Sequence, residues 1–127
     1  MDRLEAQHKS LEAGRWAQMS FANQMGNIGS EVSRAIKWRS KSRPDRAERA
    51  FFRALELMDL SIAAAAGREG TTGRLRELCR AREELCDFFA GSNLFQTKPE
   101  RLMHYYDRFA LLEKHERNLP EIEDTDQ

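Results

Sequence analysis

Apolar residues recur every three or four positions along most of the chain, and no stretch alternates with a period of two. A 3-4 spacing places apolar side chains on one face of an α-helix, whereas a half-buried strand requires alternation. The pattern therefore predicts an all-α protein with four apolar stripes. Their members are Phe21, Met25, Ile28, Val32 and Ala35; Ala47, Phe51, Ala54, Met58 and Ile62; Leu75, Leu78, Leu85 and Phe89; and Leu102, Tyr105, Tyr106, Phe109 and Leu112.

Proline and glycine indicate where these helices begin and end. Pro44 and Pro99 are each followed by an acid, as in the first turn of a helix, and Thr97 is predicted to cap the last helix together with Glu100. Gly67 follows a run of alanines and is predicted to end the second helix. Short connections favour antiparallel neighbours. We predict an antiparallel up-down four-helix bundle with a long first helix, the helices covering about 11–41, 44–66, 73–90 and 98–117.

The composition fits a single folded domain. A chain of 127 residues suits one domain, which we place at 1–117, followed by an acidic tail at 118–127 that we expect to be flexible. Hydrophobic residues make up 40%, too many for a disordered chain, although the mean hydropathy is −0.74. The 21 basic and 21 acidic residues cancel, so no strong overall field towards nucleic acid or anionic membranes is expected.

The cysteines and the lengths of the apolar runs bear on the compartment. Cys79 and Cys86 lie seven positions apart on one predicted helix, about 10 Å between their Cα atoms, which is too far for a disulfide. Two free cysteines are typical of a reducing cytosol. No apolar run is long enough to span a bilayer. We therefore predict a cytoplasmic protein without a membrane partner.

Three runs in successive predicted helices carry a general resemblance to known sequences. The runs RALELMDLSI, RLRELCRAREELCDFF and YYDRFA resemble a group of short bacterial proteins without an assigned function. The resemblance covers the second to fourth helices and implies a helical fold. It brings no functional residues with it.

Two acidic motifs suggest an enzyme as an alternative. Glu56-x-x-Asp59 and Glu84-x-x-Asp87 resemble the paired motifs of the all-helical nucleoside triphosphate pyrophosphohydrolases, and the resemblance implies that these carboxylates hold Mg²⁺. The first motif of that family normally ends in Glu rather than Asp. The helical periodicity also turns Glu56, Glu84 and Asp87 away from the apolar stripes. We favour solvated helix faces and predict no catalytic residue, metal site or cofactor.

A basic stretch at 34–53 suggests nucleic-acid binding as a second alternative. Its eight cations and two acids give a net charge of +6, and Trp38 within it could stack on a base. We favour a simpler explanation, in which cations near the end of the first helix interact with its dipole. The cations are Arg34, Lys37, Arg39, Lys41, Arg43, Arg46, Arg49 and Arg53.

Arg82 occupies an unexpected position near the centre of the third apolar stripe. A buried guanidinium requires a partner, because an unpaired buried charge is very costly. Glu31 lies at the edge of the first stripe and Glu113 within the fourth. We predict a buried Arg82–Glu31 pair, with Arg82–Glu113 as the alternative.

The predicted first helix is apolar on more than one side. Trp16, Met19 and Trp38 lie away from its main stripe, and a second apolar surface with tryptophan indicates contact with another chain. Gly26 and Gly29 form a ridge of small residues with Ala22 and Ser33, which predicts a closely packed neighbouring helix of this chain or of a second copy, with a kink or a small groove as the alternatives. We therefore predict a homodimer and favour a non-enzymatic, self-associating interaction or adaptor protein.

Overall fold

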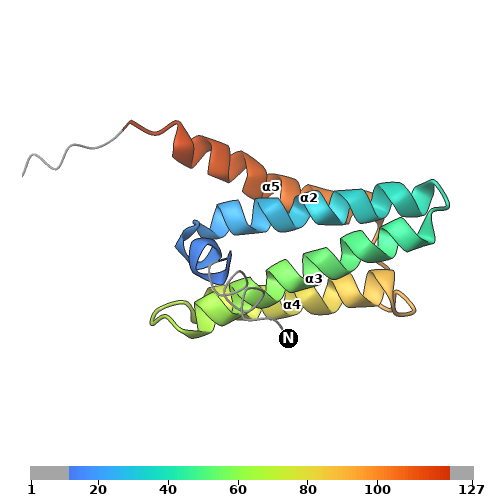
Figure 1. Ribbon diagram of the computed structural model, residues 1–127, viewed down its shortest axis with the longest axis horizontal. Coiled ribbons are helices and arrows are strands. Elements are labelled where there is room, and N and C mark those ends of the chain that lie inside the picture. The colour runs from blue at the N-terminus through green and yellow to red at the C-terminus, as the bar shows by residue number, and fades with distance from the viewer. Residues whose placement is uncertain (1–11, 121–127) are drawn as a thin grey trace, which may run out of the picture.

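The computed structural model describes residues 12–120, and every regular element in that part of the chain is a helix (Figure 1). The predicted all-α class is confirmed. Residues 1–11 and the acidic residues 121–127, which include most of the predicted tail, lie outside the described residues. Within 12–120, no helix combines the length and apolar character needed to cross a bilayer. The helices are a short one over 12–18, then α2 (Phe21–Ser40), α3 (Pro44–Ala66), α4 (Thr72–Phe89) and α5 (Pro99–Arg117).

The helices α3 and α5 begin at the prolines that the sequence indicated. Pro44 and Pro99 lie in the first turns, followed by Asp45 and Glu100, whose charges favour the positive end of a helix. The predicted capping role of Thr97 is wrong. Helix α5 begins at Pro99, so Lys98 holds the cap position, and the Thr97 hydroxyl donates instead to a carboxylate of α4.

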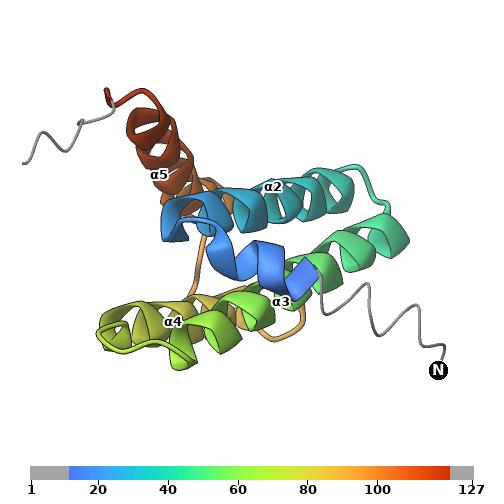
Figure 2. The ribbon, with the colours of Figure 1, turned by 60° about the vertical axis from the view of Figure 1, so that its left-hand side comes forward.

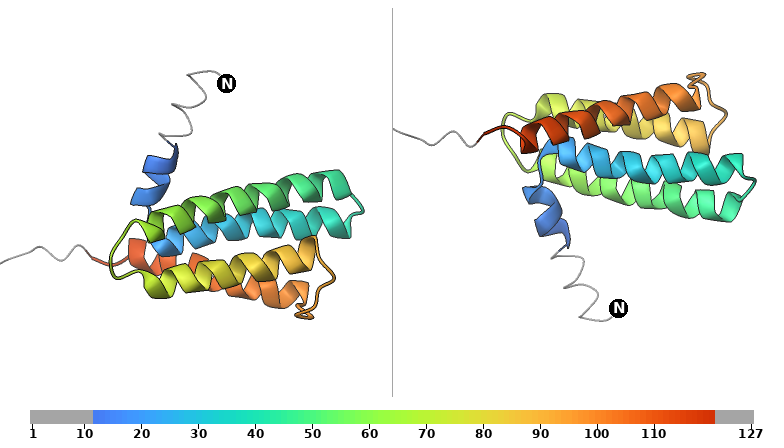
Figure 3. Two further views of the ribbon diagram at one scale, coloured as in Figure 1. Left: turned by 90° about the horizontal axis from the view of Figure 1, so that it is seen from below. Right: turned by 90° about the horizontal axis from the view of Figure 1, so that it is seen from above.

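Successive long helices run in opposite directions, as Figures 1 and 3 show. Helix α2 packs against α3 and also against α5, while α3 packs against α4. Helices α4 and α5 are joined by a loop at 90–98, and they pack less closely on each other. This looser contact leaves room for a groove between them.

The apolar stripes meet in one core. Met25, Ile28 and Val32 of α2 are completely buried, so the stripe predicted for this helix points inward as expected. Burial of side chains of this size contributes about 1.5–3 kcal/mol each. The other helices contribute Phe51, Ala54 and Met58; Leu78, Leu85 and Phe88; and Leu102 and Tyr106.

The prediction of a four-helix bundle with a long first helix is not confirmed, because the described residues contain five helices. The expected first helix is interrupted at Met19 and Ser20. The Ser20 side chain accepts a hydrogen bond from the backbone N–H of Asn23 at 3.1 Å, which caps α2. The short helix 12–18 therefore takes its own direction and crosses near α3 (Figure 2).

The break in the helix explains why its apolar residues did not fit one face. Trp16 is buried, and its Nε1–H donates to Oγ of the buried Ser61 on α3 at 2.8 Å. The Gln24 amide donates to the carbonyl oxygen of Trp16 at 2.8 Å and ties the two helices together. Met19 packs against the same core. The second apolar surface expected for partner contact is thus partly an internal surface of this chain.

The two glycines of α2 face α5. A Cβ at Gly29 would lie 2.5 Å from the Cβ of Tyr106, and one at Gly26 would lie 3.7 Å from the Cα of Ala110. The absence of a side chain at Gly29 is therefore what lets the α5 backbone approach α2 at Tyr106. The neighbour of the small-residue ridge is a helix of the same chain.

Candidate functional site between α4 and α5

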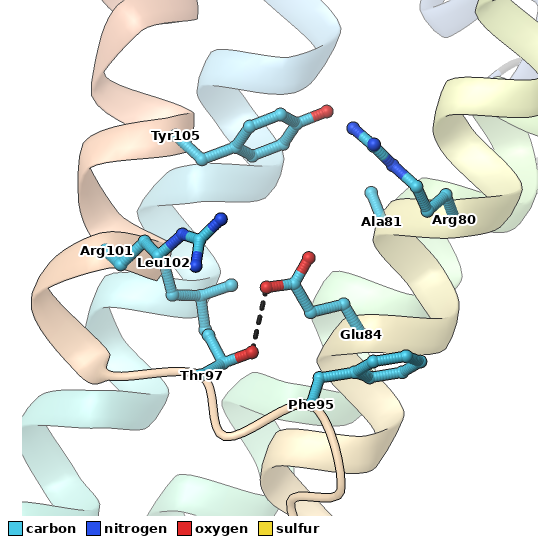
Figure 4. Close-up of a pocket in the computed structure, with 8 residues that line it drawn as sticks. All are labelled: Arg80, Ala81, Glu84, Phe95, Thr97, Arg101, Leu102 and Tyr105. Carbon is cyan, nitrogen blue, oxygen red and sulfur yellow. Dashed lines mark hydrogen bonds between the residues drawn. The ribbon is translucent and has the colours of Figure 1, made fainter.

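A groove of about 310 Å³ separates α4 from α5 near the loop that joins them (Figure 4). Its apolar floor includes Ala81 and Leu102, which are buried. Its polar and aromatic lining comes from both helices and from the loop: Arg80, Glu84, Phe95, Thr97, Arg101 and Tyr105.

The loop at 90–98 is held by hydrogen bonds to a carboxylate of α4 and by hydrogen bonds within the loop. The Asp87 carboxylate accepts from the backbone N–H groups of Leu94 at 2.8 Å and Phe95 at 3.0 Å. The Asn93 side chain accepts from the N–H of Thr97 at 2.9 Å and donates to its carbonyl oxygen at 3.1 Å. Hydrogen bonds to a carboxylate are stronger than neutral ones. The loop conformation is therefore set before any partner binds.

The same loop presents two large apolar side chains to solvent. Leu94 is 82% exposed, and Phe95, which lines the groove, is 59% exposed. Because the loop backbone is already fixed, covering these side chains does not carry the additional cost of ordering the loop. We call Leu94 and Phe95 the apolar rim.

The charges in the groove are unequal. Figure 4 shows the guanidinium groups of Arg80, from α4, and Arg101, from α5, reaching in from opposite sides. Among residues 12–120, neither has a carboxylate within ion-pairing distance. Glu84 supplies one negative charge, and it accepts a hydrogen bond from the Thr97 hydroxyl at 2.9 Å. Two cations and one anion leave the groove with a net charge of +1, which favours an anionic ligand.

Two tyrosines lie beside this cluster and stay neutral over the physiological range. Burial, and then its hydrogen bond to Glu77 at 2.8 Å, raises the pKa of Tyr105, although the charge of Arg80 opposes the shift. Burial, and then the charge of Glu84, raises the pKa of Tyr106. The Tyr106 hydroxyl has no hydrogen-bond partner within the described part of the chain. Neither phenol is set up to lose its proton in a reaction near neutral pH.

The four carboxylates of the acidic motifs each contact another group of this chain. Glu56 lies 3.5 Å from Arg53 on its own helix, whereas Asp59 pairs with an arginine of α4. Glu84 and Asp87 hold the loop, as described above. Across residues 12–120, no three histidine, cysteine or acidic side chains gather where they could hold a metal ion.

The predicted Arg82–Glu31 pair is wrong, and so is its alternative. Arg82 donates from Nε to Oδ1 of Asp59 at 2.8 Å, while Glu31 pairs with Arg34 on its own helix. Glu113 pairs with an arginine one turn further along α5. The physical reason is exposure. The Arg82 side chain is 38% exposed at the edge of the α3–α4 contact, so it did not need a buried partner from α2.

The predicted basic stretch lies where α2 turns into α3, at the right-hand end in Figure 1. Arg34 and Arg53 take part in ion pairs within their own helices. Arg39 donates to the carbonyl oxygen of Phe88 at 3.0 Å. These three cations therefore have partners within the chain.

Trp38 is held among the cations of the same stretch. The guanidinium of Arg46 lies 4.6 Å from its ring centroid, and the ammonium of Lys41 lies 5.7 Å from it. Such cation–π contacts contribute about 0.5–1 kcal/mol at exposed sites. The Trp38 ring therefore already interacts with cations of this chain.

The groove itself was not predicted from the sequence. Thr97 was expected to cap a helix, and neither Arg101 nor Phe95 was singled out. One signal was present, because Leu94 and Phe95 are an apolar pair inside the loop sequence GSNLFQTKP, which is otherwise rich in turn-forming and polar residues. An apolar pair in such a loop either packs inward or forms a contact surface.

Comparisons of the chain with protein families, with curated proteins and with solved structures found no match.

Proposed function

We propose that this chain is a non-enzymatic, self-associating interaction protein, and that the groove between α4 and α5 with its apolar rim is the contact surface. In this proposal α2–α5 act as an antiparallel helical bundle that serves as a scaffold. The observation that carries it is the apolar rim. The Asp87 carboxylate fixes the backbone amides of Leu94 and Phe95, and both side chains are exposed.

Several features of the rim support this reading. Exposed apolar groups next to polar ones are typical of protein contact sites, and arginine and aromatic residues are enriched at the centres of such contacts. Here Phe95 stands beside Arg80 and Arg101 in one groove. Because the loop is already fixed, binding avoids part of the ordering cost. The expected partner is a second copy, most simply in a C2 dimer.

The cysteines support a proposed cytoplasmic location. Cys79 and Cys86 are both free, and the first is exposed. A free exposed thiol is compatible with a reducing compartment. The two alternative functions draw less support, because the carboxylates of the acidic motifs contact other groups of this chain and two cations lie near the Trp38 ring.

Sedimentation velocity of the full chain tests the proposal. We expect a concentration-dependent dimer at tens of micromolar, and loss of that dimer in the double variant Leu94→Ser/Phe95→Ser. The matched control is Leu111→Ser/Leu119→Ser, which removes two leucines that are 68% and 54% exposed near the other end of α5.

The control should leave the dimer intact. A wild-type protein that sediments only as a 14.8 kDa monomer would refute self-association. A dimer that the control variant disrupts, and the rim variant does not, would move the contact surface away from the groove.

A further inference from the structure

We propose that the groove between α4 and α5 binds the acidic segment 121–127 of a second copy, an inference that rests on the proposed self-association. This segment, EIEDTDQ, has four acids and no basic residue. The groove has a net charge of +1, with Arg80 and Arg101 on opposite sides and free of carboxylate partners among residues 12–120. The two are complementary in charge.

The order of residues in the segment also suits the groove and its rim. Ile122 stands between Glu121 and Glu123. In an extended chain, residues two apart point to one side and the residue between them to the other. Two carboxylates could then face the two arginines, while the isoleucine meets the exposed ring of Phe95.

The length of the chain favours a second copy over the same copy. Helix α5 leads away from the groove, and about 24 Å of helix separates Arg101 from Arg117. Seven residues extend at most about 25 Å. A segment that doubled back from residue 120 would bring only its last residues near Arg101, and Glu121 and Glu123 would stay far from it. The same segment of a neighbouring molecule is not tied to this α5, so its Glu121 and Glu123 can reach the groove.

We expect the acidic segment to bind the groove with modest affinity. Glu84 lies in the same groove and opposes one of the two cations, and partly exposed ion pairs contribute about 0.2–1 kcal/mol each. The contact between segment and groove therefore adds to the apolar rim rather than replacing it, and added salt should weaken it.

A charge exchange tests the proposal. The groove variant is Arg80→Glu/Arg101→Glu, and the segment variant is Glu121→Lys/Glu123→Lys. Each alone should weaken self-association roughly tenfold. An equimolar mixture of the two variants should associate again, because each groove then meets a segment of opposite charge on the other chain. A single chain with all four substitutions should also dimerise, which controls for loss of folding.

The matched control is Arg43→Glu/Arg49→Glu, which reverses two charges at the basic end of α2 and α3 and should leave the dimer unchanged. Failure of the mixture to associate would overturn the proposal, as would full dimerisation of the groove variant alone. The charge exchange could fail although the rim variant Leu94→Ser/Phe95→Ser still loses the dimer. That result would overturn the binding of the acidic segment and leave the proposed self-association standing. A monomeric wild-type protein would overturn both proposals.

Discussion

Replacement of Gly29 by alanine directly tests how closely α2 and α5 pack. Gly29 is buried, and a Cβ added there would lie 2.5 Å from Cβ and 3.1 Å from Cγ of Tyr106. The obstructing atoms are close to the α5 backbone, so a simple rotation of a flexible side chain cannot clear them. The matched position is Gly26, where the new Cβ would meet Ala110 at an ordinary 3.7 Å.

Two opposing effects determine how much each substitution changes the free energy of unfolding. Alanine favours a helix over glycine by about 1 kcal/mol. At Gly29 the helices would have to separate by about 1.2 Å to restore a contact like the one at Gly26, and overpacking of this kind typically costs about 1–3 kcal/mol. We expect Gly29→Ala to lower the free energy of unfolding by about 1 kcal/mol net, and Gly26→Ala to raise it by up to about 1 kcal/mol.

Urea unfolding followed by circular dichroism measures both variants. At unchanged slope, a shift of the midpoint reports the change in stability. The two variants differ only in their position on one helix, so helix propensity cancels between them. Equal or greater stability of Gly29→Ala relative to Gly26→Ala would refute the close approach of α5 at Tyr106.

Three further predictions use the same urea assay. Ser61→Ala removes the acceptor of the buried Trp16 Nε1–H and should cost about 1–3 kcal/mol; an unchanged midpoint would mean that the indole has another partner. Asp87→Ala removes two hydrogen bonds to the loop after α4 and should cost about 1–3 kcal/mol while speeding hydrogen exchange of the two loop amides. Burial raises the pKa of Tyr105 and of Tyr106. Their stabilising contribution is therefore complete below the unfolded pKa of about 10 and declines as the pH rises above it; Tyr105→Phe should flatten that decline, and an unaltered pH profile would contradict the assignment.

Much of the local structure could be read from the sequence because it depends on near neighbours. Pro44 and Pro99 begin α3 and α5 as expected, since a proline ring suits the first turn of a helix. The spacing of Met25, Ile28 and Val32 identified the buried face of α2 without knowledge of what would cover it.

The break before α2 was missed because the apolar spacing could be continued through residues 19 and 20, and the capping role of Ser20 was not recognised. A contact distant in sequence accompanies the break, because Trp16 lies beside Ser61 on α3 and is buried there. A continuous helix would have carried that indole away from the core.

The candidate site could not be predicted from the sequence, because it too depends on contacts between residues distant in the chain. The sequence by itself determined that the chain is helical, which faces are apolar and that the loop after α4 carries an apolar pair. Only the tertiary structure decided that Arg82 meets Asp59 rather than Glu31, and that Arg80 and Arg101 share one groove. Such partners depend on the rotation and spacing of whole helices. Those are set by many distant contacts, such as Gly29 against Tyr106, and no local pattern encodes them.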